Sequence, residues 1–399
     1  MSKFNEPYPK NIAILGSLPP LRALSSYCLE LSLSLSTICN VNFISFQRIY
    51  PSFLYPGGDL KGDDTFPIFK HQNLNIRRIL TWYNPVTWIR EGLVTPGELL
   101  HAQWWSPPLA PIYFFVSFGF KLRKKPIIFT VHNVFQHEKM PIYNMISRIL
   151  FKLGDHFIVH SSLNKRQLIK YFNIPGDRIS KIPHGPLGFH VQGNTDRQMI
   201  RDEIGFNQKE KVILIFGAIR PYKGIDTALR AFSEVVKQIP EARLLIAGKL
   251  WERWDRYEDI ISDLNLSDYI KKHLKYIPSN KVEKFFVASD LVLLPYHHFD
   301  SQSGVGATAL AFHKPMIVTE TGGLSDLVSD RLYIVPPKDP EALAEKIIFC
   351  LKDVSRLARM SEEGHQIAED ISWHVIALKT LSVYKNVILE KRSSKKRLL

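Results

Sequence analysis

A polar segment, DSQSGVG at residues 300–306, lies between an apolar run at 290–295 and an alanine-rich segment that favours a helix. The start of a helix offers unpaired backbone N–H groups and the positive end of the helix dipole, which suit an anion such as a phosphate. Gly304 and Gly306 carry no side chain, so the backbone there can approach a ligand closely. An ordinary strand-to-helix turn with serine or aspartate as its N-cap fits the same letters, and this segment alone leaves the two interpretations even.

A second loop with phosphate-binding chemistry lies in FGAIRPYKGIDTALRAF at residues 216–232, where a strand runs into a helix. Arg220 offers a planar fork of donors and Lys223 a point charge, which together suit a diphosphate, although a solvated basic loop fits as well. Both loops follow strands of one expected sheet, so the topology would bring them to the same edge, and together they favour a nucleotide diphosphate. Neither GxxxxGK[ST] nor a clean GxGxxG occurs, so neither the ATPase phosphate loop nor the dinucleotide fingerprint applies.

A third polar cluster, IIFTVHNVFQHE at residues 127–138, contains His132 at the end of an expected strand. A histidine there can donate a hydrogen bond or transfer protons. Asn133, His137 and Glu138 lie on the same loop and favour a functional role over a structural one. The HxxxxHE spacing differs from the helical HExxH motif and is weak support for a metal. Three other histidines at strand ends are expected to line a cleft or to be structural: His101, His160 and His184.

Length and composition indicate a globular protein of two domains. The chain has 399 residues, of which 45% are hydrophobic and 23% charged. The three cysteines, at positions 28, 39 and 350, show no CxxC spacing, which fits a reducing compartment and argues against a structural zinc. No secretory signal is evident at the N-terminus, and the apolar stretch at 108–120 is too short and too marked by proline to span a bilayer as a helix.

Positive charge is concentrated in the first half of the chain. Residues 1–190 hold 21 basic and 10 acidic side chains, whereas residues 191–399 hold 31 and 28. The first half therefore faces something anionic, or its basic surface serves only solubility. The segment KRSSKKR at 391–397 is a second basic cluster, which we expect to be disordered. Binding to nucleic acid is a further hypothesis, but no recognisable motif and no basic–aromatic stripe supports it.

Short apolar runs alternate with amphipathic segments of helical length, which predicts an α/β fold with parallel, doubly wound sheets. The expected strands are 11–16, 41–46, 98–104, 126–132, 155–161, 211–219, 242–248, 275–278, 290–295 and 315–320. The expected helices include 23–36, 140–154, 225–238, 281–289 and 372–391.

The alternation breaks at HGPLGFHVQGNTD, residues 184–196, where glycine, proline and polar residues gather. We therefore predict two Rossmann-like domains, which usually bind ligands between them at the carboxyl ends of their strands. The predicted divisions are an N-terminal domain at 1–190, a linker at 191–210, a C-terminal domain at 211–375, and a final helix with its basic tail at 376–399.

The chain resembles the family 4 glycosyltransferases in the order of seven strings: TVHNVFQHE, VHSSLNKRQL, IPHGPLG, FGAIRPYKGIDTALRAF, LLIAGK, LLPYHHFDSQSGVGATALAFHKPMIV and TETGGLSDLV. The resemblance covers about residues 11–390 and is most specific from 216 to 328. It implies the GT-B fold, in which two Rossmann-like domains face each other across a cleft and the C-terminal helix crosses back to the N-terminal domain. It also implies retaining transfer from a nucleotide-diphosphate sugar, with no metal or other cofactor. The HNVxxHE and SQSGV forms resemble a bacterial subset that builds exopolysaccharide or other surface glycans.

The resemblance assigns roles to the three polar clusters. Arg220 and Lys223 match the pair that neutralises the diphosphate of the donor, and His132 matches the histidine beside the transferred sugar. Electrostatic stabilisation of the leaving diphosphate would then be the main catalytic effect. The same phosphates would be received by backbone N–H groups at the following helix start: Ser303, Gly304 and Val305.

The chain departs from the family pattern at two places. The family has two glutamates eight positions apart, the first near the sugar and the second on the ribose. Those positions fall on Asp300 and Thr308, so an acid is kept first and a hydroxyl, which cannot grip a ribose diol as a carboxylate does, comes second. The glycine pair of the first loop is represented by Gly16 alone, in GSLPPLRALSSY.

The leading hypothesis is a glycosyltransferase on the cytoplasmic side of a bacterial membrane. It would transfer a sugar from a UDP- or GDP-sugar to a glycan or lipid-linked glycan, with the basic first half facing anionic lipid. A sugar-nucleotide epimerase with the same fold is a related alternative, which the family-specific strings disfavour. A catalytically weak homologue that serves as a glycan-binding or scaffolding subunit is an alternative of a different class, which Thr308 permits.

Overall fold

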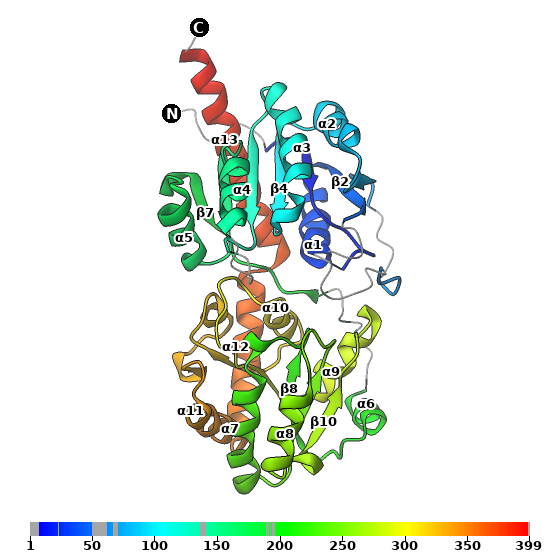
Figure 1. Cartoon of the computed structure of the whole chain (residues 1–399), viewed down its shortest axis with the longest axis vertical. Coiled ribbons are helices and arrows are strands. Elements are labelled where there is room, and N and C mark those ends of the chain that lie inside the picture. The colour runs from blue at the N-terminus through cyan, green and yellow to red at the C-terminus, as the bar shows by residue number, and fades with distance from the viewer. Residues whose placement is uncertain are drawn as a thin grey trace. The chain divides into compact units, whose positions relative to one another are not determined.

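The computed structural model describes residues 8–22, 24–49, 62–66, 71–135, 141–188, 191, 193 and 196–397. The chain divides into two compact units, Met1–Gly185 with Ser372–Leu399, and Pro186–Ile371. Each unit is built on a parallel sheet flanked by helices, which confirms the predicted α/β class with two Rossmann-like domains (Figure 1).

The first unit contains a seven-stranded sheet in the order β3-β2-β1-β4-β5-β6-β7. Its strands are β1 (Asn11–Leu15), β2 (Asn40–Arg48), β3 (Leu74–Thr81), β4 (Leu100–Trp104), β5 (Ile127–Val131), β6 (His156–Val159) and β7 (Ile179–Lys181). Because β1 pairs with both β2 and β4, the connections leave it in opposite directions. The segments that follow β1, β4 and β5 therefore meet at the carboxyl edge of the sheet, where ligands bind in such folds.

Helices cover both faces of this sheet. They are α1 (Ser25–Ser36), α2 (Pro85–Val94), α3 (Ala110–Leu122), α4 (Pro141–Phe151), α5 (Ser162–Phe172) and α13 (Trp373–Arg397). One core joins the sheet to α2, α3, α4 and α5, and it includes Trp88, Tyr113 and Leu168. A second core, on the other face, joins Ile14 to α1 and to Tyr384 of α13. The C-terminal helix thus returns to the first unit, as predicted.

The second unit contains a six-stranded sheet in the order β10-β9-β8-β11-β12-β13. Its strands are β8 (Lys211–Phe216), β9 (Ala242–Ala247), β10 (Ile270–His273), β11 (Leu291–Leu294), β12 (Met316–Thr319) and β13 (Ile334–Val335). β8 pairs with β11, so the two loops that we expected to bind phosphate follow neighbouring strands.

The helices of the second unit are α6 (Arg197–Ile204), α7 (Ile225–Gln238), α8 (Asp255–Asp263), α9 (Val282–Ala288), α10 (Gly304–Ala311), α11 (Pro340–Leu351) and α12 (Val354–Asp370). α7 begins and ends at the predicted residues, because it buries Ile225, Leu229 and Phe232 at helical spacing.

The domain boundaries differ from those expected. The first unit ends at Gly185 and the second runs from Pro186 to Ile371, so the linker predicted at 191–210 belongs to the second unit. The glycine and proline that suggested a linker precede α6, whose Arg201 is tied to Asp290 of the same unit at 2.6 Å. Composition marked a loop there, and the ion pair makes the following helix part of the domain.

Two further expectations need correction. The strand expected at 275–278 lies earlier, at β10, whose residues pair with β9; Pro278 has no N–H to donate to such a ladder. The basic segment at 391–397 is helical rather than disordered, since it continues α13. Lys391 in this segment pairs with Asp155 at 2.7 Å, which holds the helix to the first unit.

Within the described ranges, no helix is both long and apolar enough to cross a membrane. The apolar stretch at 108–120 forms most of α3, which has 13 residues.

Candidate functional site

The loop after β8 places Lys223 at the carboxyl edge of the second sheet. A single 3-10 turn, Pro221–Lys223, leads into Gly224, which has a positive φ of 68° and begins α7. A Cβ at Gly224 would lie 1.9 Å from the carbonyl oxygen of Pro295, so the turn can pack against the end of β11 only with glycine. This contact fixes Lys223 beside the strand that leads to the polar segment at 300–306.

Lys223 is a buried cation, with 6% of its surface exposed. Its Nζ donates to the hydroxyl of Tyr296 at 2.6 Å and to the carbonyl of Phe216 at 3.3 Å. Among the described residues, no carboxylate lies within ion-pair distance of this ammonium group, and burial lowers the pKa of Lys223. A buried ammonium group that has no carboxylate partner is stabilised strongly by an anionic ligand.

Tyr296 connects the two predicted phosphate loops. Its hydroxyl accepts from Lys223 and lies 3.1 Å from Oγ of Ser303, the N-cap of α10. Burial raises the pKa of Tyr296, so the phenol stays neutral, and either hydroxyl of the Tyr296–Ser303 pair can donate to the other. Ser303 Oγ also accepts from the N–H of Gly306 at 3.3 Å. The structure therefore brings Lys223 and Ser303 together, as the strand-end argument predicts.

Gly217 leaves space beside this cation. Its φ is 94°, and a Cβ there would lie 3.0 Å from Cγ2 of Val305 and 3.4 Å from Nζ of Lys223. Sequence reasoning did not single out Gly217 or Tyr296. The signals were present, since each stands directly or almost directly after a buried strand, in FGAIR and LLPYHH.

The first turn of α10 supplies backbone donors to the same place. Ser303 caps the helix, while Gly304 is exposed and a Cβ on it would meet only Leu187, at 3.9 Å. The N–H groups of the first turn have no carbonyl four residues back within the helix, so they favour an anion. The predicted backbone site at Ser303, Gly304 and Val305 thus has the geometry of an anion-binding helix start.

Arg220 is held by stacking. Its guanidinium carbon lies 3.9 Å from the ring centroid of Trp251, which follows β9. Trp251 donates its backbone N–H to Ile219, so the loops after β8 and β9 are joined. Stacking of this kind orients the donor fork of an arginine while leaving its edge for a ligand.

Asp300 and Thr308 lie on either side of the helix start. The Asp300 loop is tied down by the turn at residues 321–323, because Gly323 N–H donates to the carbonyl of Ser301 at 3.0 Å. Thr308 is buried, and its hydroxyl donates to the carbonyl of Gly304 at 2.9 Å. The proton of that hydroxyl is therefore used inside the helix, which agrees with the poor match of threonine to a ribose-binding carboxylate.

His132 directly follows β5 and is buried inside the first unit. Its Nδ1 lies 3.1 Å from Nε2 of His160, and its Nε2 lies 3.0 Å from the side-chain amide oxygen Oε1 of Gln103. His160 Nδ1 donates to the carbonyl of Ile182 at 2.9 Å. The Nε2–H of His132 donates to this amide oxygen, while the amide nitrogen of Gln103 lies 3.2 Å from Nε2 of His101. Both nitrogens of the predicted catalytic histidine are thus engaged within the unit.

Gly16 directly follows β1 and lies beside this network. A Cβ at Gly16 would lie 3.0 Å from Sγ of Cys28 and 3.2 Å from Cγ of Gln103. Tyr27 of α1 packs edge-on against His132, with ring centroids 4.6 Å apart. The structure therefore brings Gly16 and His132 together through Gln103. Sequence reasoning missed Gln103, for which its place next to the end of the expected strand at 98–104 was the available signal.

Stability of the first unit is expected to fall as the pH falls below about 6.5, the pKa of a histidine in an unfolded chain. Burial lowers the pKa of His132 well below this value and lowers that of His160 to about 3 and of His184 to about 4. Because the folded pKa values are depressed, the stabilisation is fully present above pH 6.5 and is lost towards those lower values. Each histidine should contribute about 1.4 kcal/mol per pH unit in this window.

Urea unfolding followed at about pH 7.5 and about pH 5.5 measures this loss. The His160→Gln variant should take up about one proton fewer than wild type on unfolding at the lower pH, because glutamine is polar but does not titrate. The dependence of its unfolding free energy on pH should be correspondingly weaker. Equal pH slopes for wild type and His160→Gln would contradict the assignment of His160 to a neutral buried network.

Metal ligation receives no geometric support within the described part of the chain, where no group of three or more His, Cys, Asp or Glu side chains is arranged to hold an ion. His137 and Glu138, which follow His132 in the sequence, lie outside the described residues.

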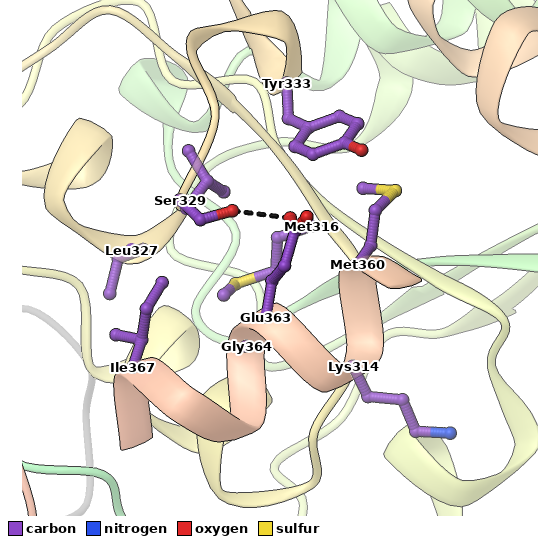
Figure 2. Close-up of a pocket in the computed structure, with 10 residues that line it drawn as sticks. Lys314, Met316, Leu327, Ser329, Tyr333, Met360, Glu363, Gly364 and Ile367 are labelled. Carbon is purple, nitrogen blue, oxygen red and sulfur yellow. Dashed lines mark hydrogen bonds between the residues drawn. The ribbon is translucent and has the colours of Figure 1, made fainter. Parts of the chain in front are cut away.

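A small pocket lies behind α12, and none of the predicted site residues lines it (Figure 2). Its walls include the thioethers of Met316 and Met360, and its carboxylate, Glu363, accepts a hydrogen bond from Ser329 at 2.5 Å. Lys314 extends away from the other lining residues and donates to the carbonyl of Ser289. We assign no chemistry to this pocket.

Solved structures define the class of the fold. Sucrose-phosphate synthase from Thermosynechococcus elongatus is similar over 96% of this chain and all of its own, with a TM-score of 0.71 and 17% identity. Anabaena Alr3699/HepE in complex with UDP is similar over 94% of this chain and all of its own, with a TM-score of 0.71 and 14% identity. With two parallel α/β units and a returning C-terminal helix, the chain has the GT-B fold.

Two protein families match the units. Residues 65–185 match Glycosyltransferase Family 4, and residues 196–367 match Glycosyl transferases group 1. The chain therefore carries the two domains of the GT-B glycosyltransferases, a family 4 domain followed by a group 1 domain.

Curated relatives match over part of their length. A D-inositol 3-phosphate glycosyltransferase of Segniliparus rotundus is 28% identical over 238 residues, which are 58% of this chain and 52% of that protein. The uncharacterized glycosyltransferase MJ1607 of Methanocaldococcus jannaschii is 28% identical over 229 residues, which are 55% of this chain and 57% of that protein. The chain thus spans about half the length of the curated relatives it matches.

Proposed function

We propose that this protein is a glycosyltransferase that moves a sugar from a UDP- or GDP-sugar to a glycan or lipid-linked glycan, with retention of configuration and without a metal. The observation that carries the proposal is the buried Lys223, which has no carboxylate partner among the described residues. Hydrogen bonds through Tyr296 link it to Ser303, the N-cap of α10. A diphosphate supplies the negative charge that this arrangement lacks.

The site would act mainly by stabilising the leaving diphosphate. Lys223 and the N–H groups of the first turn of α10 would stabilise the negative charge that develops on the diphosphate as its bond to the sugar breaks. Because these donors are already in position, they need not reorganise during the reaction. Arg220, held flat on Trp251, would add a second cation. Anabaena Alr3699/HepE, which has a similar fold, is known in complex with UDP and with UDP-glucose, and this supports a uridine donor among the candidates.

The finer parts of the proposal rest on the motif resemblance. They are retention, independence of a metal, a role in surface polysaccharide synthesis, and a cytoplasmic place on the inner face of the membrane. Three residue roles are predictions that rest on the same resemblance: contact of His132 and of Asp300 with the sugar, and contact of Thr308 with the nucleotide.

Nucleotide binding tests the proposal. Titration calorimetry with UDP, GDP, ADP and their sugars should show tight binding of at least one diphosphate, and Gly217→Ala should weaken it about tenfold or more, since its methyl group lies between Lys223 and Val305. Gly176→Ala is the matched control, because a Cβ there makes an ordinary contact of 3.5 Å with Ile169 in the first unit. If no diphosphate binds the wild-type protein, the donor site is wrongly placed.

A catalytically weak glycan-binding subunit is the second candidate function. The observation that favours it is the Thr308 hydroxyl, whose proton is bound to Gly304 rather than offered to a ribose. This candidate predicts tight glycan binding with no turnover of any donor. Release of free sugar or UDP from a donor would exclude it.

A further inference from the structure

The helical layer formed by α2, α3, α4 and α5 of the first unit exposes an unusual surface. In α2 the inward side chains include Trp88 and the carboxylate of Glu91, whereas Val86, Ile89 and Leu93 face outward. Val86 is 72% exposed. A surface helix normally turns its apolar stripe to the core. A second apolar stripe that faces solvent therefore indicates a surface that binds another molecule or a membrane.

Aromatic side chains continue the apolar stripe before α2. Trp82 and Tyr83 are exposed, and their rings meet edge to face at 5.3 Å between centroids. Tryptophan and tyrosine combine an apolar ring with a polar group, and they concentrate at the boundary between lipid and water.

α3 extends the surface on the other side of α2. The two helices touch backbone to backbone, since a Cβ at Gly119 would lie 2.5 Å from the carbonyl carbon of Gly92. The outward residues Phe118 and Leu122 of α3 are exposed, and Phe114 stacks on Phe118. The outward faces of α2 and α3 therefore form one continuous apolar area.

α4 repeats the pattern next to α3. Its exposed side chains include Ile142, Met145 and Ile149, and its buried Phe151 shares the core of α2 and α3. These helices cover the same face of the sheet (Figure 1). We call the exposed apolar side chains of α2, α3 and α4, with Trp82 and Tyr83, the apolar face.

The four helices around the apolar face carry mostly positive charge. The sequences of α2 to α5 contain a single acid, Glu91, which is buried and paired with Arg77 at 2.9 Å. The cations on these four helices are Arg90, Lys121, Arg148, Lys165, Arg166 and Lys170. Lys121 is paired with Asp155, which follows α4, at 3.2 Å. A surface of exposed apolar and aromatic groups with a large excess of positive charge is complementary to an anionic lipid bilayer, in which the apolar groups enter the interface and the cations meet phosphates.

We propose that the apolar face docks the first unit onto an anionic phospholipid bilayer. This inference rests on the proposed function for its purpose, which is access to a lipid-linked acceptor, while the binding itself stands on the surface alone. A bilayer fits better than a protein partner because the cations are spread over four helices, and the one acidic side chain within these helices, Glu91, is buried.

Vesicle sedimentation with the full chain tests the proposal. The protein should sediment with phosphatidylcholine vesicles that contain about 30% phosphatidylglycerol, remain in solution with phosphatidylcholine alone, and dissociate as salt rises. The triple variant V86S/L93S/L122S should bind the anionic vesicles about tenfold less, with its circular dichroism unchanged since the three side chains are exposed. The matched control is V354S, which removes an equally exposed valine (74%) from the second unit and should bind as wild type does.

Three outcomes would overturn the proposal. They are no sedimentation of the wild-type protein with anionic vesicles, vesicle binding by the triple variant equal to that of wild type, or a wild-type dimer in solution that becomes a monomer in the triple variant. Calorimetry with UDP on the same triple variant separates this inference from the proposed function. Lost vesicle binding with retained nucleotide binding supports docking, whereas vesicle binding by a protein that binds no nucleotide leaves docking intact and removes the donor site.

Discussion

Replacing Lys223 with methionine is expected to lower the rate of sugar transfer about 100- to 1,000-fold, the loss typical of removing one preorganised donor to a developing anion. Methionine fills much of the volume of the lysine side chain, so the change removes the charge and the hydrogen bond to Tyr296 while keeping most of the packing. The rate is measured as release of the nucleoside diphosphate from whichever donor binds in the calorimetric titrations.

Stability separates a catalytic loss from a folding defect in this experiment. Removing a buried ammonium that lacks a carboxylate partner among the described residues should leave the urea midpoint unchanged or raise it. Lys237→Met is the matched control, because Lys237 lies on α7, which follows Lys223 in the chain, but is exposed and paired with Glu234. Wild-type turnover by Lys223→Met would show that the diphosphate does not bind at this loop.

The closeness of Lys223 and Ser303 could be predicted from the sequence, because it depends on the sheet topology alone. Two loops after adjacent parallel strands must lie at one edge, whatever their side chains are. Tyr296 and Trp251 did not follow in this way. Their roles depend on a hydrogen bond across 73 positions of chain and on a stacking distance of 3.9 Å, which no local pattern encodes.

The region of β3 and α2 shows another limit of sequence patterns. α2 has apolar residues on its outer side and a buried glutamate on its inner side, so helical periodicity does not separate a core face from a solvent face there. No strand or helix was expected between residues 74 and 94. The same inversion that hides the helix in the sequence is the feature that marks the apolar face.

The expected linker at 191–210 shows how composition can mislead about a domain boundary. Glycine and proline mark a loop, but they carry no information on what the following helix contacts. Arg201 on α6 is 2% exposed and donates to the carbonyls of Ala288 and Glu210, each at 3.0 Å. It also forms the 2.6 Å ion pair with Asp290, whose second role is to accept the N–H of Val212 at the start of β8.

Replacing Arg201 with alanine is therefore expected to destabilise the second unit by about 3 to 5 kcal/mol, the loss found when one partner of a buried ion pair is removed. The cost arises because Asp290 is left with the more exposed Arg197 as a cationic partner, and the carbonyl groups of Ala288 and Glu210 lose their donor. Urea unfolding gives the value, with Arg230→Ala on the exposed side of α7 as the matched control, expected within about 0.5 kcal/mol of wild type. An Arg201→Ala protein as stable as that control would mean that α6 is a connector, as its composition suggests, and that the second unit begins after it.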